Sequence, residues 1–477
     1  MNQSPLRLVT AFLAISASLV CFASLEFMLV AIQKDFSMSA DATVALAQIS
    51  AGACLAVVFL AGSLADRLGD RTVMTVACIG LATGAFIVGL SSSSTVLLLG
   101  VSLTGMATIT MAIVGLSVLN KIFETTADRA RAFGVFAVVA PVMSITVPLL
   151  AGLIVPRAGW RSMTVLWVAV ALTTLLFARR TLRCASPNRA SDSQRLELFT
   201  PLLAGLALAG IGLTFSFINI NSRSQQHLGH AIISSIVGVT AILLLVVVIR
   251  LRSGLGSRTT LDLRWFQARG SFSIFIVVFL LFSVNLFFYT FLLMQFRYHQ
   301  TLLETAVILV LPQVTAAFGA IFGGRASAKW GSSRVATTAL LGAAALSFGV
   351  FFVQPESSPW VAVVVLALAA VPISGAVGPV TQSFMTLAPT DGEGAASSLR
   401  NAASNLGIAI GGVIVASIIF NDLDADTERN FAAYQQQTDA FHLAGVFCIV
   451  GYLFAAGLVA VHRSRSRAAM SPIHSVH

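Results

Sequence analysis

One carboxylate lies deep inside an apolar run of the sequence, where it is well placed to carry protons. The chain has 19 Asp and Glu residues, and nearly all fall in polar breaks, whereas Glu26 lies within the run 8–32. A carboxylate inside a bilayer costs on the order of 3 kcal/mol, so such residues are usually functional. Burial favours the neutral carboxyl, which can give up its proton to make way for a cationic solute. The alternative is that Glu26 only reaches the outer membrane surface from the last third of its helix.

A second group of charged residues is framed by glycines in the stretch 62–71, which reads Gly-Ser-Leu-Ala-Asp-Arg-Leu-Gly-Asp-Arg. Gly62 and Gly69 permit a close helix approach and a tight reversal. Asp66 can accept hydrogen bonds from a helix N-terminus, and Arg67 and Arg71 can pair with acids. Because such contacts can break and re-form, we predict a gating loop here. The alternative is an ordinary solvated basic loop.

Uncharged polar and aromatic residues form a third group of candidates. Asn285, Phe288 and Gln295 lie in the apolar run 271–296, and Gln313 lies in the run 302–323. Amides can bind a solute or bridge two helices, and aromatic rings suit flat lipophilic ligands. We treat these four residues as candidates for a substrate cavity, with helix packing as the alternative.

The sequence shows no sign of an enzyme. The five cysteines and seven histidines have no metal-ligand spacing, and the phosphate-binding pattern G-x-x-x-x-G-K-[ST] does not occur. We therefore expect no metal, no cofactor and no ATP-driven step carried out by this chain.

The composition indicates which elements must position these residues. Apolar residues make up 57% of the 477 residues and charged residues only 10%, against roughly a quarter charged in soluble domains. Apolar runs of about 20 to 25 residues are the length that crosses a bilayer as a helix. The sequence therefore predicts an all-α integral membrane protein and excludes a soluble enzyme or nucleic-acid-binding protein. The runs are 8–32, 43–64, 73–91, 95–119, 133–155, 161–178, 198–219, 230–250, 271–296, 302–323, 335–353, 360–387, 396–420 and 440–462.

Charge supports this count of fourteen. If both termini face the cytoplasm, 23 of the 29 Lys and Arg residues fall on that side. Cytoplasmic loops of membrane proteins carry such an excess of basic residues. A wrong number of spans would scramble the alternation, so the split predicts both the number of spans and their orientation.

The pattern of the stretch 62–71 occurs twice. Residues 324–331 read Gly-Arg-Ala-Ser-Ala-Lys-Trp-Gly, with the same glycine spacing at an offset of 262 residues. In this copy Ala328 replaces the acid, so any gating contact there is expected to be weaker. We infer a six-helix bundle over 1–178, two inserted helices with basic loops over 179–270, and a second six-helix bundle with a short tail over 271–477. Repeated halves are typical of transporters, whose substrate site lies between them near the midplane.

The stretch 62–71 closely resembles the signature G-x-L-a-D-R-x-G-r-k of the major facilitator superfamily. The fourteen runs resemble its drug:proton antiporter branch, which inserts two helices between its halves. The segment 147–152 is similar to the end of the antiporter helix-5 motif, G-P-x-x-G-G, and keeps Pro148 and Gly152. The resemblance implies the major facilitator fold with 14 transmembrane helices in a 6+2+6 arrangement, and export by alternating access.

Two positions depart from the family pattern. The arginine that is usual in helix 4 is replaced by Val101, and the aspartate that is usual in helix 1 falls at Ser24, two residues before Glu26. Two residues rotate a side chain by roughly 200° around a helix. Either Glu26 therefore takes the role from another direction or the role is absent.

We expect a secondary active exporter of amphipathic drugs or toxic metabolites, in exchange for protons, in the inner membrane of a bacterial-type cell. Its expected partners are the small-molecule substrate, protons and membrane lipids, with no nucleic acid, and the chain is expected to be monomeric. The alternative is a dedicated exporter of one metabolite, lipid or peptide without proton coupling, which Val101 favours. A third reading is a membrane sensor or scaffold that does not transport.

Overall fold

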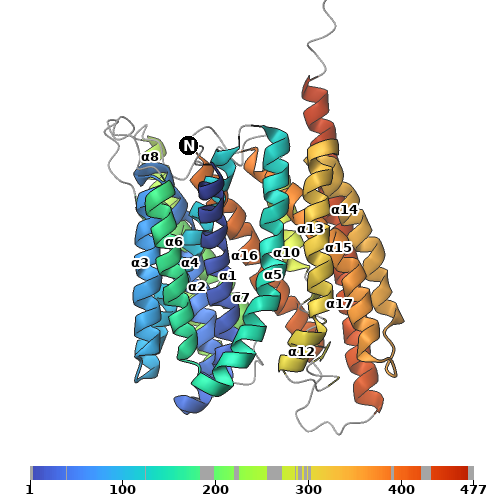
Figure 1. The fold of residues 1–477 in the computed structure, drawn as a ribbon, viewed down its shortest axis with the longest axis horizontal. Coiled ribbons are helices and arrows are strands. Elements are labelled where there is room, and N and C mark those ends of the chain that lie inside the picture. The colour runs from blue at the N-terminus through green and yellow to red at the C-terminus, as the bar shows by residue number, and fades with distance from the viewer. Residues whose placement is uncertain are drawn as a thin grey trace, which may run out of the picture. The chain divides into compact units, whose positions relative to one another are not determined.

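Every secondary-structure element described in this computed structural model is a helix (Figure 1). The structure describes residues 4–38, 40–123, 125–182, 198–219, 225–254, 271–284, 286–287, 290, 293–294, 298, 302–387, 392–420 and 431–470. The side chains of some further residues within these helices, including Glu26, also lie outside the described part. The contacts between Cα atoms divide the chain into two compact units.

The first unit comprises 1–123, 146–263 and 388–402. In it α4 packs against α1, α2 and α3, and α6 packs against α1 and α3. Helix α4 begins where the Ser93 hydroxyl accepts a hydrogen bond from the Val96 amide, a standard N-cap. The helices that lie wholly in this unit are α1 (Ser4–Asp35), α2 (Ala40–Leu68), α3 (Asp70–Gly89), α4 (Ser94–Ile122), α6 (Ser162–Thr181), α7 (Phe199–Asn219) and α8 (Gln225–Gly254).

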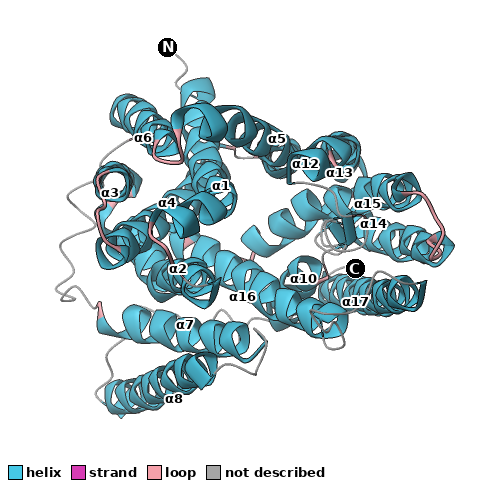
Figure 2. Cartoon of the chain, turned by 90° about the horizontal axis from the view of Figure 1, so that it is seen from below, coloured by secondary structure: helices cyan, strands magenta, loops and turns pink. Residues whose placement is uncertain are grey.

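The two helices predicted as an insert form a pair beside α2. Helix α7 packs against α2, and α8 packs against α7 (Figure 2). A Cβ built on Gly205 of α7 would lie 2.0 Å from the carbonyl oxygen of Ala56, and one built on Gly210 would lie 2.3 Å from the Cα of Gly238 in α8. These glycines let the backbones approach closely, as small residues do between membrane helices.

The second unit comprises 124–145, 264–387 and 403–477. Helix α15 packs against α13 and α14, and α17 packs against α10 and α14. The helices that lie wholly in this unit are α10 (Ser271–Ser283), α12 (Leu302–Ile308), α13 (Val310–Trp330), α14 (Ser332–Ser347), the short 3-10 helix η2 (Phe348–Phe352), α15 (Pro359–Met385) and α17 (Phe431–Met470).

Two helices pass from one unit to the other along the chain. Helix α5 (Thr126–Ala158) belongs to the second unit up to residue 145 and to the first unit afterwards. Helix α16 (Glu393–Phe420) does the reverse, with its first turns in the first unit and the part from residue 403 in the second.

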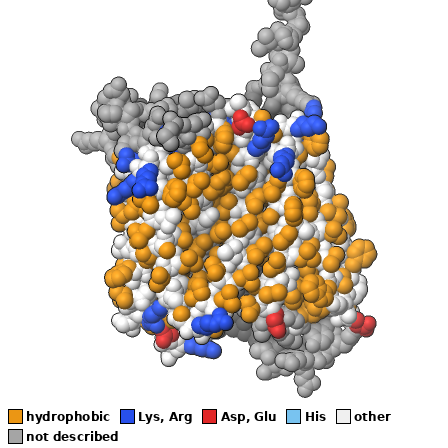
Figure 3. All heavy atoms as spheres, in the orientation of Figure 1, with side chains coloured by type: hydrophobic (Ala, Val, Ile, Leu, Met, Phe, Trp, Pro, Cys, Tyr) orange, Lys and Arg blue, Asp and Glu red, His pale blue; other side chains and the backbone are white. Residues whose placement is uncertain are grey.

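Eleven helices in the described part of the chain are long and apolar enough to cross a membrane. Large apolar side chains lie on the outside of these helices: Val76, Phe86 and Val165 are 65%, 64% and 68% exposed. Hydrophobic side chains cover the surface seen in Figure 3, and Lys and Arg gather near its two ends. Such a surface suits lipid rather than water, so the chain is a multi-pass membrane protein. The arrangement of fourteen helices and the boundaries at 178 and 270 stay predictions.

Candidate functional site

Asp66 binds the N-terminus of a helix that lies far away in the sequence. One oxygen of its carboxylate accepts a hydrogen bond from the Gly394 amide at 2.8 Å, and the other accepts one from the Ala395 amide at 2.9 Å. Gly394 and Ala395 belong to the first turn of α16, whose amides have no partner within the helix. A carboxylate at this place satisfies two of these amides and is attracted by the positive end of the helix dipole.

The backbones meet one turn before Asp66. A Cβ built on Gly62 would lie 2.3 Å from the Gly394 carbonyl oxygen and 1.9 Å from the hydroxyl of Ser398. A side chain at residue 62 would therefore push α16 away, so glycine is needed there for the Asp66 contact to form.

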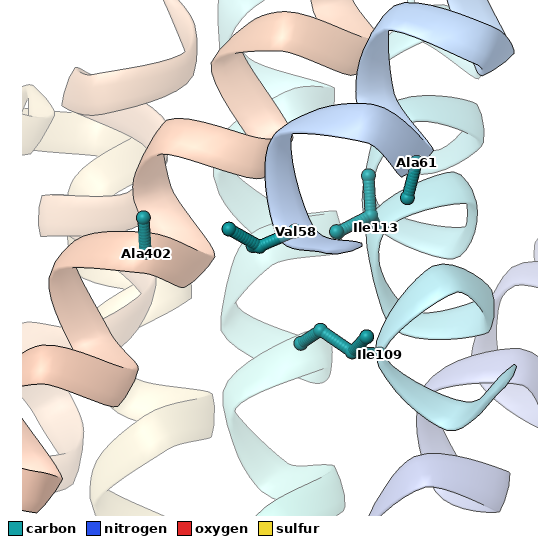
Figure 4. Close-up of a cluster of buried hydrophobic side chains, with 5 residues drawn as sticks. All are labelled: Val58, Ala61, Ile109, Ile113 and Ala402. Carbon is teal, nitrogen blue, oxygen red and sulfur yellow. The ribbon is translucent and has the colours of Figure 1, made fainter. Parts of the chain in front are cut away.

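A small apolar cluster continues the packing of α2 against α16 and adds α4. Val58 and Ala61 of α2 lie beside Ile109 and Ile113 of α4, and Ala402 of α16 closes the cluster (Figure 4). All five residues are buried. The first turns of α16 are thus held in the first unit by apolar contacts as well as by Asp66.

An ion pair that the sequence analysis did not single out lies next to this contact. Lys121 near the end of α4 binds Asp70 at the start of α3, with 3.0 Å between Nζ and Oδ2. Gly69, between Asp66 and Asp70, has a φ of 85°, which few other residues adopt. In the sequence, the position of Asp70 directly after Gly69 could have indicated a functional charge. Its partner Lys121 is 51 residues away, so the pair itself could not be predicted.

The two arginines of the predicted loop lie on either side of Gly69. Arg67 lies in the last turn of α2, Arg71 lies in the first turn of α3, and both are partly buried.

Val101, at the position where the family has an arginine, is fully buried in α4. The described part of the first unit does have a buried arginine, Arg400 of α16, which is 6% exposed.

The other predicted site residues lie in one or the other unit or outside the described residues. Pro148 and Gly152 lie in the part of α5 that belongs to the first unit. Gln313 is buried near the start of α13, in the second unit. Asn285, Phe288 and Gln295 lie outside the described residues, as does the side chain of Glu26, so their predicted roles stay predictions.

A polar cluster fastens the ends of α1, α3 and α6 in the first unit. The Trp160 indole donates to the Asp35 carboxylate at 3.0 Å, and Arg161 both pairs with Asp35 and donates to the Ser91 carbonyl at 3.1 Å. The Arg161 guanidinium also stacks over the Trp160 ring, 4.4 Å from its centre. The hydrogen bond from Arg161, followed by that from Trp160, holds the pKa of Asp35 below its ordinary value of 3.8.

The second unit repeats part of the loop geometry. Gly331 has a φ of 86°, matching the 85° of Gly69, so the chain reverses in the same way between α13 and α14. A Cβ built on Gly324 would lie 2.5 Å from the Cα of Gly134 in α5. The absence of a side chain at Gly324 thus lets α5 approach α13 closely in the second unit, as Gly62 lets α16 approach α2 in the first.

Several curated proteins resemble this chain over part or most of its length. Multidrug resistance protein Stp of Mycobacterium tuberculosis is 28% identical over 132 residues, which is 28% of this chain and 24% of that protein. Puromycin resistance protein pur8 of Streptomyces alboniger is 28% identical over 157 residues, 33% of this chain and 31% of that protein. The riboflavin transporter RibZ of Clostridioides difficile is 20% identical over 400 residues, 82% of this chain and 84% of that protein. The matches to the two resistance proteins therefore span less than a third of each relative.

The fold is shared with a solved structure and the sequence with a known family. The human organic anion transporter MFSD10 (TETRAN) superposes with a TM-score of 0.63 at 16% identity, covering 95% of this chain and 99% of that one. Residues 10–412 match the family described as Major Facilitator Superfamily. With its helical fold, its glycine-framed loop and this match over most of its length, the chain belongs to the major facilitator superfamily of membrane transporters.

Proposed function

We propose that this chain is a secondary active exporter of amphipathic drugs or toxic metabolites that works by alternating access. In this proposal the chain crosses a bacterial-type inner membrane fourteen times, in a 6+2+6 arrangement, with both termini in the cytoplasm. Three of the relatives are named as resistance proteins: Stp, pur8 and the methylenomycin A resistance protein of Bacillus subtilis.

The observation that carries the proposal is the contact between Asp66 and the start of α16. It is made of two charge-assisted hydrogen bonds to amides in the first turn of α16, and hydrogen bonds to charged groups contribute about 1.5–3 kcal/mol each. Contacts of this strength can break and re-form within the microsecond-to-second timescale of large conformational changes. Because α16 continues into the second unit, releasing its first turn frees a helix that both units share.

Protons are the proposed driving ion, with Glu26 as the group that exchanges them. The proposal is supported by the position of Glu26 in the last third of α1, whose other residues are mainly apolar. Each inward proton supplies about 2.3 kcal/mol per 100 mV, to which the pH gradient adds.

A dedicated exporter is the second candidate, and two observations favour it. Val101 occupies the position of the arginine that is usual in the antiporters, and RibZ, named as a riboflavin transporter, aligns over most of both chains. A substrate panel in everted membrane vesicles separates the two candidates. Movement of both ethidium and puromycin supports the drug exporter, whereas movement of riboflavin alone supports the dedicated one.

A further inference from the structure

Gln382 is a buried amide at the end of α15, in the second unit. Its side chain is only 1% exposed. A buried amide costs free energy unless its oxygen and nitrogen both find partners, and here both do. Its partners come from three different helices.

The oxygen of the amide faces two serine hydroxyls beside Gly331. Ser332, the first residue of α14, donates to Gln382 Oε1. Ser327, near the end of α13, donates to Ser332 at 2.9 Å and lies 3.5 Å from the same Oε1. The amide oxygen thus ties α15 to the reversal between α13 and α14.

The nitrogen of the amide holds the first residue of α5. Gln382 Nε2 donates to the Thr126 carbonyl at 2.8 Å, across a sequence separation of 256 residues. The reverse orientation of the amide would place its oxygen against a carbonyl oxygen, so the network fixes which end points to α5.

Backbone packing supports this contact. A Cβ built on Gly378 of α15 would lie 2.9 Å from the Phe133 carbonyl oxygen, and one built on Gly134 would lie 2.5 Å from the Cα of Gly324. The first turns of α5 are therefore pressed closely against both α13 and α15, and Gln382 fixes where α5 begins.

The offset of 262 residues relates this network to the charged contacts of the first unit. Ser332 corresponds to Asp70, and Gln382 corresponds to Asn120, the neighbour of Lys121. In the first unit the Asp70–Lys121 ion pair joins α3 to α4, while Asp66 separately holds α16. In the second unit, where Ala328 replaces the acid, Gln382 makes both connections with one neutral side chain.

We propose that Gln382 is a positioning residue for transport, which holds the start of α5 in the second unit as Asp66 holds the start of α16 in the first. This inference rests on the proposed transport function. The two contacts then differ in chemistry: Asp66 holds α16 with a charged carboxylate, and Gln382 holds α5 with a neutral amide.

Hydrogen exchange of the full-length protein tests the contact without any substrate. In Gln382→Glu the carboxylate still accepts from Ser332 but cannot donate to the Thr126 carbonyl, so amides 130–134, the first that are bonded within α5, should exchange about tenfold faster. The control is Ser383→Ala, since the neighbouring Ser383 hydroxyl donates to the Pro379 carbonyl within its own helix. Unchanged exchange at the start of α5 in Gln382→Glu would overturn the proposal.

A second variant guards against misfolding. Ser332→Ala removes the donor that orients the amide but leaves Nε2 able to reach Thr126, so we expect a smaller increase in exchange over the same amides. If Gln382→Glu does not fold, unchanged exchange in Ser332→Ala overturns the proposal.

Transport of ethidium in vesicles supplies the functional readout. Gln382→Glu should lower the turnover number about tenfold with an unchanged KM, because α5 is released while the substrate site is intact. An equal change in both constants, or none in either, would contradict a positioning role. Failure of the wild type to move ethidium, puromycin or riboflavin would instead count against the proposed function, and the exchange experiment would still decide the contact.

Discussion

Gly62 and Gly394 are in backbone contact: a Cβ built on either residue would lie within 2.5 Å of the other's carbonyl oxygen. The contact joins residues 332 positions apart and sets the distance at which Asp66 reaches the amides of α16.

Replacing Gly62 by valine should reduce ethidium efflux at least tenfold. The added methyl groups collide with the backbone of α16, and overpacking of this kind costs about 1–3 kcal/mol. Efflux is measured in vesicles with equal amounts of folded protein. Gly457→Val is the control, since no described atom lies within 4 Å of a Cβ built on Gly457. Equal efflux from the wild type and the Gly62 variant would show that the close approach is not required.

Asp66→Asn should slow turnover more than it weakens binding. The amide still accepts one hydrogen bond but loses the charge that the helix N-terminus attracts, which is worth roughly tenfold in rate. Turnover is followed by efflux and binding by ethidium fluorescence polarisation on purified protein. Asp439→Asn changes an exposed acid of α17 and serves as the matched control. If binding and turnover fall together, Asp66 is not a gating residue.

Asp35→Asn should lower the thermal stability of the purified protein at neutral pH but not at low pH. Arg161 and Trp160 lower the pKa of Asp35 in the folded state, so the ionised carboxylate stabilises the fold above the ordinary pKa of 3.8. This contribution is lost as the pH falls through the lowered value. The melting temperatures of wild type and variant should therefore differ from pH 8 to pH 5 and converge in stronger acid. A difference that grows on acidification would have the wrong sign.

Glu26→Gln should abolish efflux driven by a pH gradient while expression stays normal. The glutamine cannot release a proton, so the exchange proposed for α1 has no carrier. Ethidium uptake into everted vesicles is measured with and without an imposed gradient. Gradient-driven uptake at the wild-type rate would remove Glu26 from the mechanism.

Local features of the sequence predicted much of the fold but few of its contacts. Long apolar runs predicted helices, and each run falls largely in helix where the structure describes it. The exceptions include residues 90–91 and 386–387, which lie beyond the ends of α3 and α15, and residue 309, where the run 302–323 divides into α12 and α13. Gly69 and Gly331 indicated where the chain reverses, and both adopt positive φ values that glycine tolerates readily. The helix bound by Asp66 could not be identified in this way, since its amides lie 328 positions further along the chain. Gln382 was missed for a related reason: an amide in an apolar run has no distinguishing pattern until the helices that surround it are known.

The central claim, that this chain exports solutes through a gate closed by Asp66, is tested most directly in sealed liposomes that contain only the purified protein. With an imposed pH gradient and a panel of ethidium, puromycin and riboflavin, the account predicts saturable movement of at least one solute by the wild type and at least tenfold slower movement by Asp66→Asn. Liposomes that move none of these solutes, or that move them equally fast with both proteins, would contradict it.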